Sequence, residues 1–293
     1  WGLGAAPQGS AVGNFTVLGS MTPEGNVLFS LLSDGVPNSL SGQITGDASS
    51  GIMVLHPYAG SGTYGPASAA SIMPVSAIAA GQTYFISNVG TSVIPAFTGG
   101  TLQVDTAGQV YGQNFTLDGS VGNRLDQRGN GALLSGVLSD ASPGTPGQIT
   151  IANSESGGRI VLTGASTYTG PTFVEAGATL MVNGSIVSPV TVGGVLGGTG
   201  TVGATAIGNG GVLAPGNSIG TINVLGNLSF ARGAIYAGEG SPSAADRTNV
   251  TGAASLQGTT LAVFAPGNYS PRGYTLLSVA GGRSGTFGTF ATA

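Results

Sequence analysis

The chain contains no cysteine, no lysine and a single histidine, His56, and only 6% of its 293 residues are charged. Without lysine a P-loop is impossible, because the lysine of that motif contacts the nucleotide phosphates. The net charge of −4 and the absence of a basic patch argue against a nucleic-acid partner, which would need clustered Lys and Arg. The lack of cysteine fits either a reducing compartment or a chain exported unfolded through a narrow pore.

Long apolar runs and disorder-prone composition are absent as well. A mean hydropathy of +0.31 with so few charges argues against intrinsic disorder. The 55 glycines do not follow a three-residue period, which excludes collagen. No window offers about 20 consecutive apolar residues, so no transmembrane helix is predicted.

Short strand-like segments closed by Gly, Asn or Asp recur along the chain, most densely from Gly157 to Phe290. These segments are rich in β-branched and aromatic residues, and glycine every few residues disfavours helices. The leucines that recur 15 to 18 residues apart mark equivalent apolar positions: Leu162, Leu180, Leu196, Leu213 and Leu228. Such a period indicates units that bury their apolar faces by stacking.

The pattern predicts an all-β chain folded as a right-handed parallel β-helix, with Ile, Val and Leu inward and Thr, Ser and Asn facing water. At roughly 20 residues a turn, we expect about 14 or 15 coils. A β-sandwich is the main alternative, because short strands with frequent turns also suit it. We expect three parts: residues 1–156 as β-helix turns with irregular loops, 157–225 as regular repeat turns, and 226–293 as a C-terminal cap.

The phrase from Leu162 to Ser185, LTGASTYTGPTFVEAGATLMVNGS, resembles the passenger-associated β-strand repeat of bacterial autotransporters. That repeat runs approximately L-x-G-x-N-T-Y-T-G-x-T-x-V-x-x-G-T-L. The phrases Gly193–Gly203 and Gly210–Phe230 are similar to those that follow the repeat in this family. Ser166 replaces the usual Asn, and Pro171 replaces a usual Gly. The resemblance covers residues 157–290.

The resemblance implies an exported protein of a Gram-negative bacterium, at the cell surface or secreted, that passes through the outer-membrane barrel of its own precursor. That barrel would follow Ala293, and any signal peptide would precede Trp1. By the same analogy, residues around 226–290 order first on emergence and template the earlier turns. Nearest-neighbour stacking makes this order reasonable, because each coil needs a preformed edge to pair with.

Two short patterns imitate catalytic motifs. Gly216–Gly220, GNSIG, matches the nucleophile elbow G-x-S-x-G, but no helix pattern follows it and His56 is the only histidine. Gly198–Gly203, GTGTVG, matches a dinucleotide-binding fingerprint, but it opens no helix and no acid lies about 20 residues on. We interpret both as turns. His56 has no neighbouring ligands for zinc, so it is expected to be a turn residue.

Charged residues gather in NRLDQRGN, where Arg124, Asp126 and Arg128 alternate along one strand. A β-helical lyase or glycosidase would use an Arg base or paired carboxylates of this kind. A solvated strand face with local ion pairs is the preferred interpretation. Asp246 and Arg247 lie in a phrase that recurs at passenger ends, so a structural role is expected for them.

We therefore expect no enzymatic activity, no catalytic, cofactor-binding or metal-binding residue, and no cofactor. The favoured function is a structural protein acting in adhesion, self-association or an extracellular fibre. Its partners would be further copies of itself and surface or glycan receptors. Two alternatives stay open: a β-helical polysaccharide-cleaving enzyme, and a receptor-binding module on loops of residues 1–156, which look less regular in Met21–Leu40 and Thr63–Phe85.

Overall fold

The computed structural model describes residues 15–21, 27–33, 41–45, 54–57, 75–89, 94–256, 259–264 and 273–292. It divides the chain into two units, residues 1–73 and residues 74–293. Each unit is described by itself. No helix in the described ranges is long and apolar enough to cross a membrane.

The first unit contains an antiparallel sheet with strand order β1-β2-β3-β4. Its strands are β1 (Phe15–Met21), β2 (Val27–Ser33), β3 (Ser41–Thr45) and β4 (Val54–Pro57). This differs from the expectation of β-helix turns throughout residues 1–156. The segments between these strands are too short for parallel pairing, which needs a crossover of about a dozen residues or more. The segment Met21–Leu40 contains all of β2, and Thr63–Phe85 contains the strands Ala77–Ala79 and Thr83–Phe85 of the second unit, so these parts are strands and not the expected loops. The other residues between 22 and 40 and between 63 and 74 fall outside the described residues.

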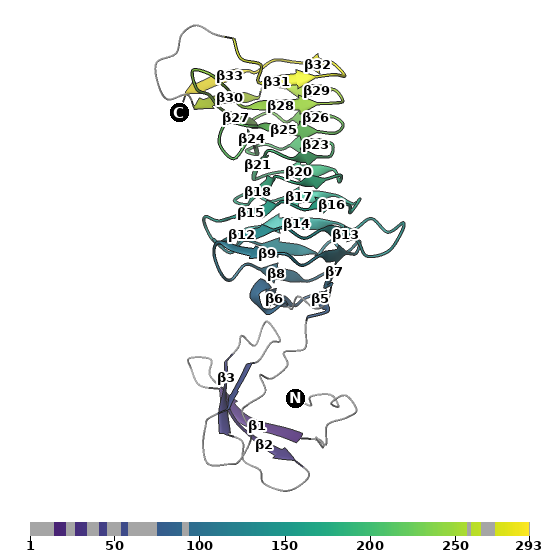
Figure 1. The fold of residues 1–293 in the computed structure, drawn as a ribbon, viewed down its shortest axis with the longest axis vertical. Coiled ribbons are helices and arrows are strands. Elements are labelled where there is room, and N and C mark those ends of the chain that lie inside the picture. Colours follow the sequence, from purple (N-terminus) through teal and green to yellow (C-terminus); the bar gives the residue numbers. More distant parts are fainter. Residues whose placement is uncertain are drawn as a thin grey trace. The chain divides into compact units, whose positions relative to one another are not determined.

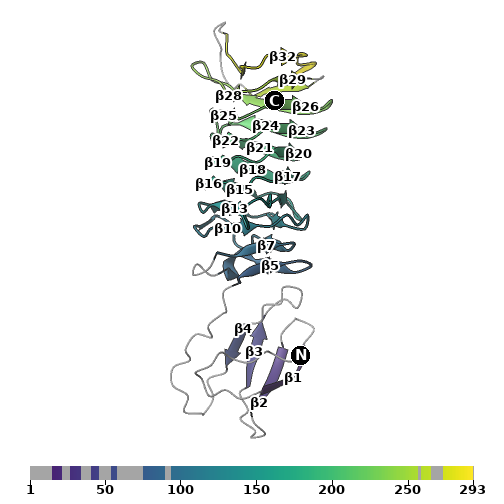
Figure 2. The ribbon, with the colours of Figure 1, turned by 90° about the vertical axis from the view of Figure 1, so that its right-hand side faces the viewer.

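The second unit is a parallel β-helix, as the sequence predicts, and its strands stack coil upon coil (Figures 1 and 2). Each regular coil contributes one strand to each of three faces, in the same order. The first face, face 1, is a ten-stranded sheet: β6 (Thr83–Phe85), β8 (Thr101–Gln103), β11 (Arg124–Asp126), β14 (Ile149–Ala152), β17 (Thr172–Val174), β20 (Val190–Val192), β23 (Thr205–Ile207), β26 (Leu228–Phe230), β29 (Ala254–Leu256) and β32 (Arg283–Ser284).

The next face along each coil, face 2, is a nine-stranded sheet. Its strands are β9 (Gln109–Tyr111), β12 (Gly131–Leu134), β15 (Arg159–Leu162), β18 (Thr179–Val182), β21 (Val195–Gly198), β24 (Val212–Pro215), β27 (Ile235–Glu239), β30 (Thr260–Phe264) and β33 (Thr289–Thr292). A 3-10 turn, η1 (Ile86–Asn88), follows β6 in the first coil.

The third face, face 3, consists of two sheets. The first has four strands: β5 (Ala77–Ala79), β7 (Ala96–Thr98), β10 (Phe115–Leu117) and β13 (Leu138–Asp140). The second has six: β16 (Ala165–Ser166), β19 (Ser185–Ile186), β22 (Thr201–Val202), β25 (Thr221–Val224), β28 (Arg247–Val250) and β31 (Leu277–Val279). Between the two, the backbone N–H of Leu138 donates to the Ser166 hydroxyl at 3.1 Å, and the N–H of Thr167 donates to the carbonyl of Leu138 at 2.8 Å.

The register of face 2 tests the predicted apolar ladder. Leu180, Leu196 and Leu213 are stacked in register and fully buried, as predicted. The prediction is wrong for Leu162 and Leu228. Leu162 pairs with Val182, and Leu228 belongs to face 1. Their places in the ladder are taken by Ile160, which pairs with Leu180, and by Tyr236, which pairs with Leu213. The two leucines were misplaced because the loops at the corners of the coils differ in length. The number of residues between equivalent strand positions therefore changes from one coil to the next.

Coil length varies along the stack for the same reason. Successive positions in the face 2 ladder, from Ile160 to Leu180, Leu196, Leu213, Tyr236, Leu261 and Phe290, lie 20, 16, 17, 23, 25 and 29 residues apart by subtraction. Face 1 therefore holds ten strands, fewer than the 14 or 15 coils expected from the whole length. The right-handed sense of the coil stays a prediction, supported by the general preference of parallel crossovers.

Candidate functional site

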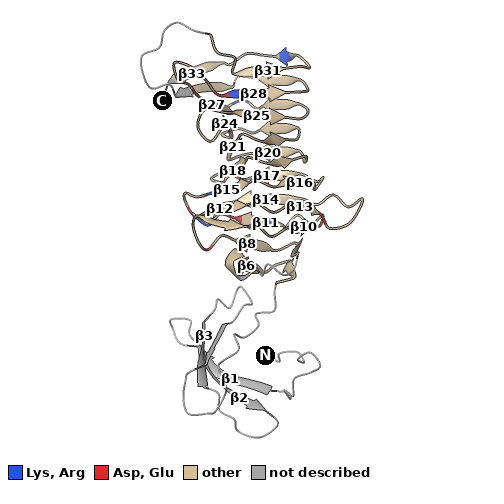
Figure 3. Cartoon of the chain, in the orientation of Figure 1, with Lys and Arg blue, Asp and Glu red and all other residues tan. Residues whose placement is uncertain are grey.

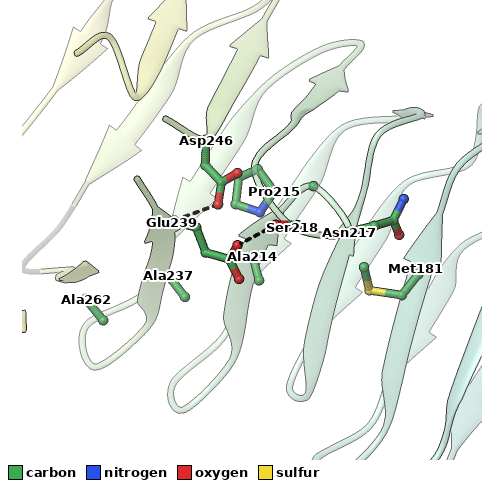
Figure 4. Close-up of a pocket in the computed structure, with 11 residues that line it drawn as sticks. Met181, Ala214, Pro215, Asn217, Ser218, Ala237, Glu239, Asp246 and Ala262 are labelled. Carbon is green, nitrogen blue, oxygen red and sulfur yellow. Dashed lines mark hydrogen bonds between the residues drawn. The ribbon is translucent and has the colours of Figure 1, made fainter. Parts of the chain in front are cut away.

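A pocket of about 250 Å³ lies on the outer side of face 2 (Figure 4). Strands β24, β27 and β30 give it an alanine floor, and the turn after β24 and the loop after β27 give it polar groups. It is lined by Met181, Ala214, Pro215, Gly216, Asn217, Ser218, Ala237, Gly238, Glu239, Asp246 and Ala262. The GNSIG segment therefore forms part of this pocket.

Ser218 lies in the turn between β24 and β25, and no helix follows it, because β25 begins at Thr221. The geometry therefore differs from a nucleophile elbow, in which a strand leads into a helix. The Ser218 hydroxyl is exposed and donates to Oε2 of Glu239 at 3.2 Å. The segment is a turn, as the sequence analysis preferred.

Asp246 joins two loops of the pocket through backbone hydrogen bonds. The N–H of Gly220 donates to its Oδ1 at 2.8 Å, and the N–H of Glu239 donates to its Oδ2 at 2.7 Å. Asp246 is buried, and this burial together with the nearby Glu239 carboxylate raises its pKa, against the effect of the two N–H donors. The carboxylate thus fixes the turn after β24 against the end of β27.

The pocket brings two acids together, which is the arrangement that a polysaccharide-cleaving enzyme would require. The two carboxyl groups are not equivalent. Glu239 is exposed, whereas each oxygen of Asp246 already accepts a main-chain N–H. The observed contacts therefore give Asp246 a loop-fixing role, and the glycan-cleaving alternative stays a hypothesis that rests on Glu239 alone.

The Arg124–Arg128 segment forms ion pairs that reach between coils. Nη1 and Nη2 of Arg124 each lie 2.6 Å from a carboxylate oxygen of Glu175, a residue 51 positions later and two coils away. Arg128 donates to Glu155 at 3.3 Å and lies over the Phe85 ring at 5.3 Å. The sequence indicated local pairs within the segment, and it does not reveal these partners because they depend on coil register.

Asp126, between the two arginines in sequence, is buried and binds neither guanidinium in the described structure. Its Oδ1 accepts the backbone N–H groups of Ser154 at 2.8 Å and Arg128 at 3.0 Å, and its Oδ2 accepts from Gln103 at 3.1 Å. Burial alone would raise the pKa of Asp126, but these hydrogen bonds outweigh it and leave the pKa below its usual value.

Replacing Asp126 by asparagine is expected to lower the free energy of unfolding by about 1–3 kcal/mol at pH 7, because buried donors lose a charged acceptor. A depressed folded-state pKa means that the ionised group stabilises the fold above its unfolded pKa of about 3.9, and that this is lost as pH falls through the folded value. The difference between the variant and the wild type should therefore shrink progressively as pH falls below about 5. Thermal unfolding followed by circular dichroism at each pH measures it.

The control is Glu155→Gln, which removes one partner of an exposed ion pair and should change the free energy of unfolding by less than about 0.5 kcal/mol. If the difference in stability between Asp126→Asn and the wild type were the same at every pH, the role assigned to the Asp126 carboxylate would be wrong.

A buried chain of hydroxyls was not predicted. The Tyr168 hydroxyl lies 2.6 Å from Oγ1 of Thr172, which lies 2.7 Å from Oγ of Ser188, and all three side chains are buried. Burial raises the pKa of Tyr168. The expectation that Thr and Ser face water is wrong here, because Thr172 occupies an inward position of β17 and finds its partners inside the coil.

The remaining sequence candidates show no ligand-like geometry in the described part. The GTGTVG segment forms the end of β21 and strand β22. His56 lies in β4, whose side chains fall outside the described residues. Within the described ranges, no three His, Asp or Glu side chains gather as a metal site would require.

Comparisons with known proteins give one relative to consider. No protein-family model matches the chain. An 81-residue stretch, 27% of the chain, is 44% identical to the extracellular serine protease of Serratia marcescens. The matched stretch is 8% of that protein's length, so the chain spans a small part of it. The similarity to an extracellular protein and the parallel coils agree with the resemblance to an exported passenger.

The comparison opposes the expectation that the chain has no enzymatic activity. That expectation rested on the lack of a recognisable catalytic set in the sequence, and it is overturned as an expectation because a stretch of the chain is similar to a protein named as a serine protease.

Proposed function

We propose that this chain is exported and acts outside the cell as a structural β-helical stem, in adhesion, self-association or an extracellular fibre. The observation that carries the proposal is the uninterrupted parallel ladder from β6 to β32, inside which the stacked coils bury one continuous apolar core. Such solenoids offer long surfaces built from repeated rows, and surfaces of this kind suit binding along their length. Similarity to an extracellular protein supports the location.

The low charge of the described coils supports an associating role. Figure 3 shows charged residues only at scattered places on the second unit, so little repulsion opposes contact with another neutral surface. Surface or glycan receptors remain proposed partners. Early ordering of residues 226–293 during export is also part of the proposal. Contacts within this segment support it, because the Tyr236 hydroxyl donates to the carbonyl of Leu276 at 2.7 Å and the Tyr236 ring packs against Phe287.

Display of the chain on a Gram-negative cell tests the proposal. The chain is anchored at the outer surface, exposure is measured with an antibody on intact cells, and settling of the suspension is followed over time. We expect antibody labelling and faster settling than for cells carrying the anchor alone. Labelled cells that neither settle nor adhere would contradict the associating role, and an unlabelled chain would contradict export.

Proteolysis is a second candidate function, favoured by the name of the relative. Incubating the purified chain with casein tests it. Cleavage that a serine-directed inhibitor blocks would support this candidate, and intact casein after prolonged incubation would oppose it.

A further inference from the structure

The pocket on face 2 has an apolar floor made of alanine side chains (Figure 4). Ala214, Ala237 and Ala262 follow one another in the adjacent strands β24, β27 and β30, and each is partly exposed on the outer side of the sheet. With strands about 4.8 Å apart, the three methyl groups form a strip about 10 Å long. The floor therefore offers an apolar contact and no hydrogen-bonding side chain.

A methionine closes one end of this strip. Gly197 in β21 is the next member of the same row, since it pairs with Ala214. A Cβ added at Gly197 would lie 2.9 Å from both Sδ and Cε of Met181, so the methionine side chain fills the space that a larger residue would take. Met181 is 7% exposed and gives the pocket a second apolar contact beside Ala214.

A carboxylate lies at the polar side of the floor. Ala237 and Glu239 are alternate residues of β27, so they point to the same side of the sheet. The Glu239 carboxylate accepts the hydroxyl of Ser218 through Oε2 at 3.2 Å. Neither ion pair of the described structure involves Glu239. Its Oε1 is thus an exposed charged acceptor at the edge of an apolar strip.

The charge of the pocket favours a cationic ligand. Its described lining contains two carboxyl groups, those of Glu239 and Asp246, and no Lys, Arg or His. Burial and, after it, the Glu239 carboxylate raise the pKa of Asp246, so the charge of Glu239 acts across the pocket. A cation placed between the floor and Glu239 would offset this negative charge.

An amine suits the pocket better than a metal ion does. Calcium takes six to eight oxygen ligands, whereas each oxygen of Asp246 already accepts a main-chain N–H. Within the described ranges, no three His, Asp or Glu side chains gather. Methyl groups give a metal ion no ligand, but they suit an aliphatic stem, since lysine stems lie along apolar surfaces with the ammonium group in water.

We propose that this pocket binds a primary ammonium group carried on an aliphatic stem. The stem lies over Ala214 and Ala237, and the nitrogen donates to the Glu239 carboxylate and to the Ser218 oxygen, whose lone pairs stay available while its hydrogen is donated. A lysine side chain of a polypeptide and a free diamine share this chemistry. The inference goes beyond the proposed function and requires neither self-association nor export.

Titration of the ¹⁵N-labelled chain with pentylamine, followed by ¹H–¹⁵N NMR, tests the charged end of the site. We expect saturable shifts of the Gly216 and Gly238 amide signals, with a dissociation constant of about 1 mM, as suits so small a ligand. Glu239→Gln keeps the shape of the side chain and should weaken binding about fivefold or more. Glu155→Gln, an exposed glutamate outside the pocket, is the matched control and should leave binding unchanged.

The floor is tested separately. Ala237→Leu fills the strip and should also weaken pentylamine binding about fivefold or more, because the stem loses its place. The matched control is Ala206→Leu, the same change at an exposed outward position of β23 on face 1. Pentanol, which lacks the charge, and methylamine, which lacks the stem, should each bind about fivefold more weakly than pentylamine or worse. Circular dichroism confirms that the variants fold.

Two further ligands distinguish the sources of the amine. If Nα-acetyl-lysine methylamide saturates the same signals, a lysine side chain of a polypeptide fits the site; if only putrescine does so, the ligand is a free diamine. Three results would each overturn the proposal: no saturation by any amine, binding of pentanol, calcium or methyl glucoside as tight as that of pentylamine, or equal effects of Glu239→Gln and Glu155→Gln.

Discussion

Replacing Leu196 by alanine is expected to lower the free energy of unfolding by about 3 kcal/mol, because a fully buried leucine leaves a cavity when it is truncated. Leu196 lies between Leu180 and Leu213 in adjacent coils, so its loss weakens two coil interfaces at once. In a solenoid, stability is approximately a sum of such neighbour terms. Denaturant unfolding followed by circular dichroism measures the change.

The matched control for Leu196 is its neighbour Val195, which points outward from the same strand. Val195→Ala removes little buried surface and should cost less than about 1 kcal/mol. If both variants lost the same free energy, the inward and outward assignments of β21 would be wrong.

Replacing Gly198 by alanine is expected to destabilise the fold by about 3 kcal/mol or more, because two penalties combine. Gly198 has a φ of 106°, which a side chain rarely tolerates. An added Cβ would also lie 2.2 Å from the backbone oxygen of Val182, so the neighbouring coil would have to move. The midpoint of denaturant unfolding reports this loss.

Gly210→Ala separates the two penalties. Gly210 has a φ of 75°, but nothing lies within 4 Å of an added Cβ. Only conformational strain applies there, and we expect a cost of about 1–2 kcal/mol. A Gly198→Ala variant no worse than Gly210→Ala would show that the coils are not packed as closely as described.

Much of the second unit can be predicted from the sequence, because the features that define its strands lie within short segments of the chain. Gly-bounded, β-branched segments can bury themselves only by stacking, and Leu180, Leu196 and Leu213 were placed in one ladder correctly. Leu162 and Leu228 were not, because loop lengths at the corners decide the register and vary from coil to coil. The first unit was missed for a related reason: its strands are as apolar as those of the coils, and only the short connections between them indicate antiparallel pairing.

The candidate site was less predictable than the fold. The GNSIG segment stood out in the sequence, but its proximity to Glu239 and Asp246 depends on how two adjacent coils stack. The partners of Arg124 and Asp126 likewise lie one or two coils away. The apolar nature of face 2 becomes visible only when its strands are aligned in register, because Ala and Gly are frequent everywhere in this chain.

The parallel register of the coils is the central claim, and disulfide cross-linking tests it directly, since the chain has no cysteine of its own. Ala206 and Ser229 are in-register partners in adjacent strands of face 1, so cysteines placed at both positions should oxidise to a disulfide. Cysteines at Thr191 and Ser229 lie two coils apart, about 10 Å, and should remain unlinked. A link in the second pair but not in the first would contradict the account.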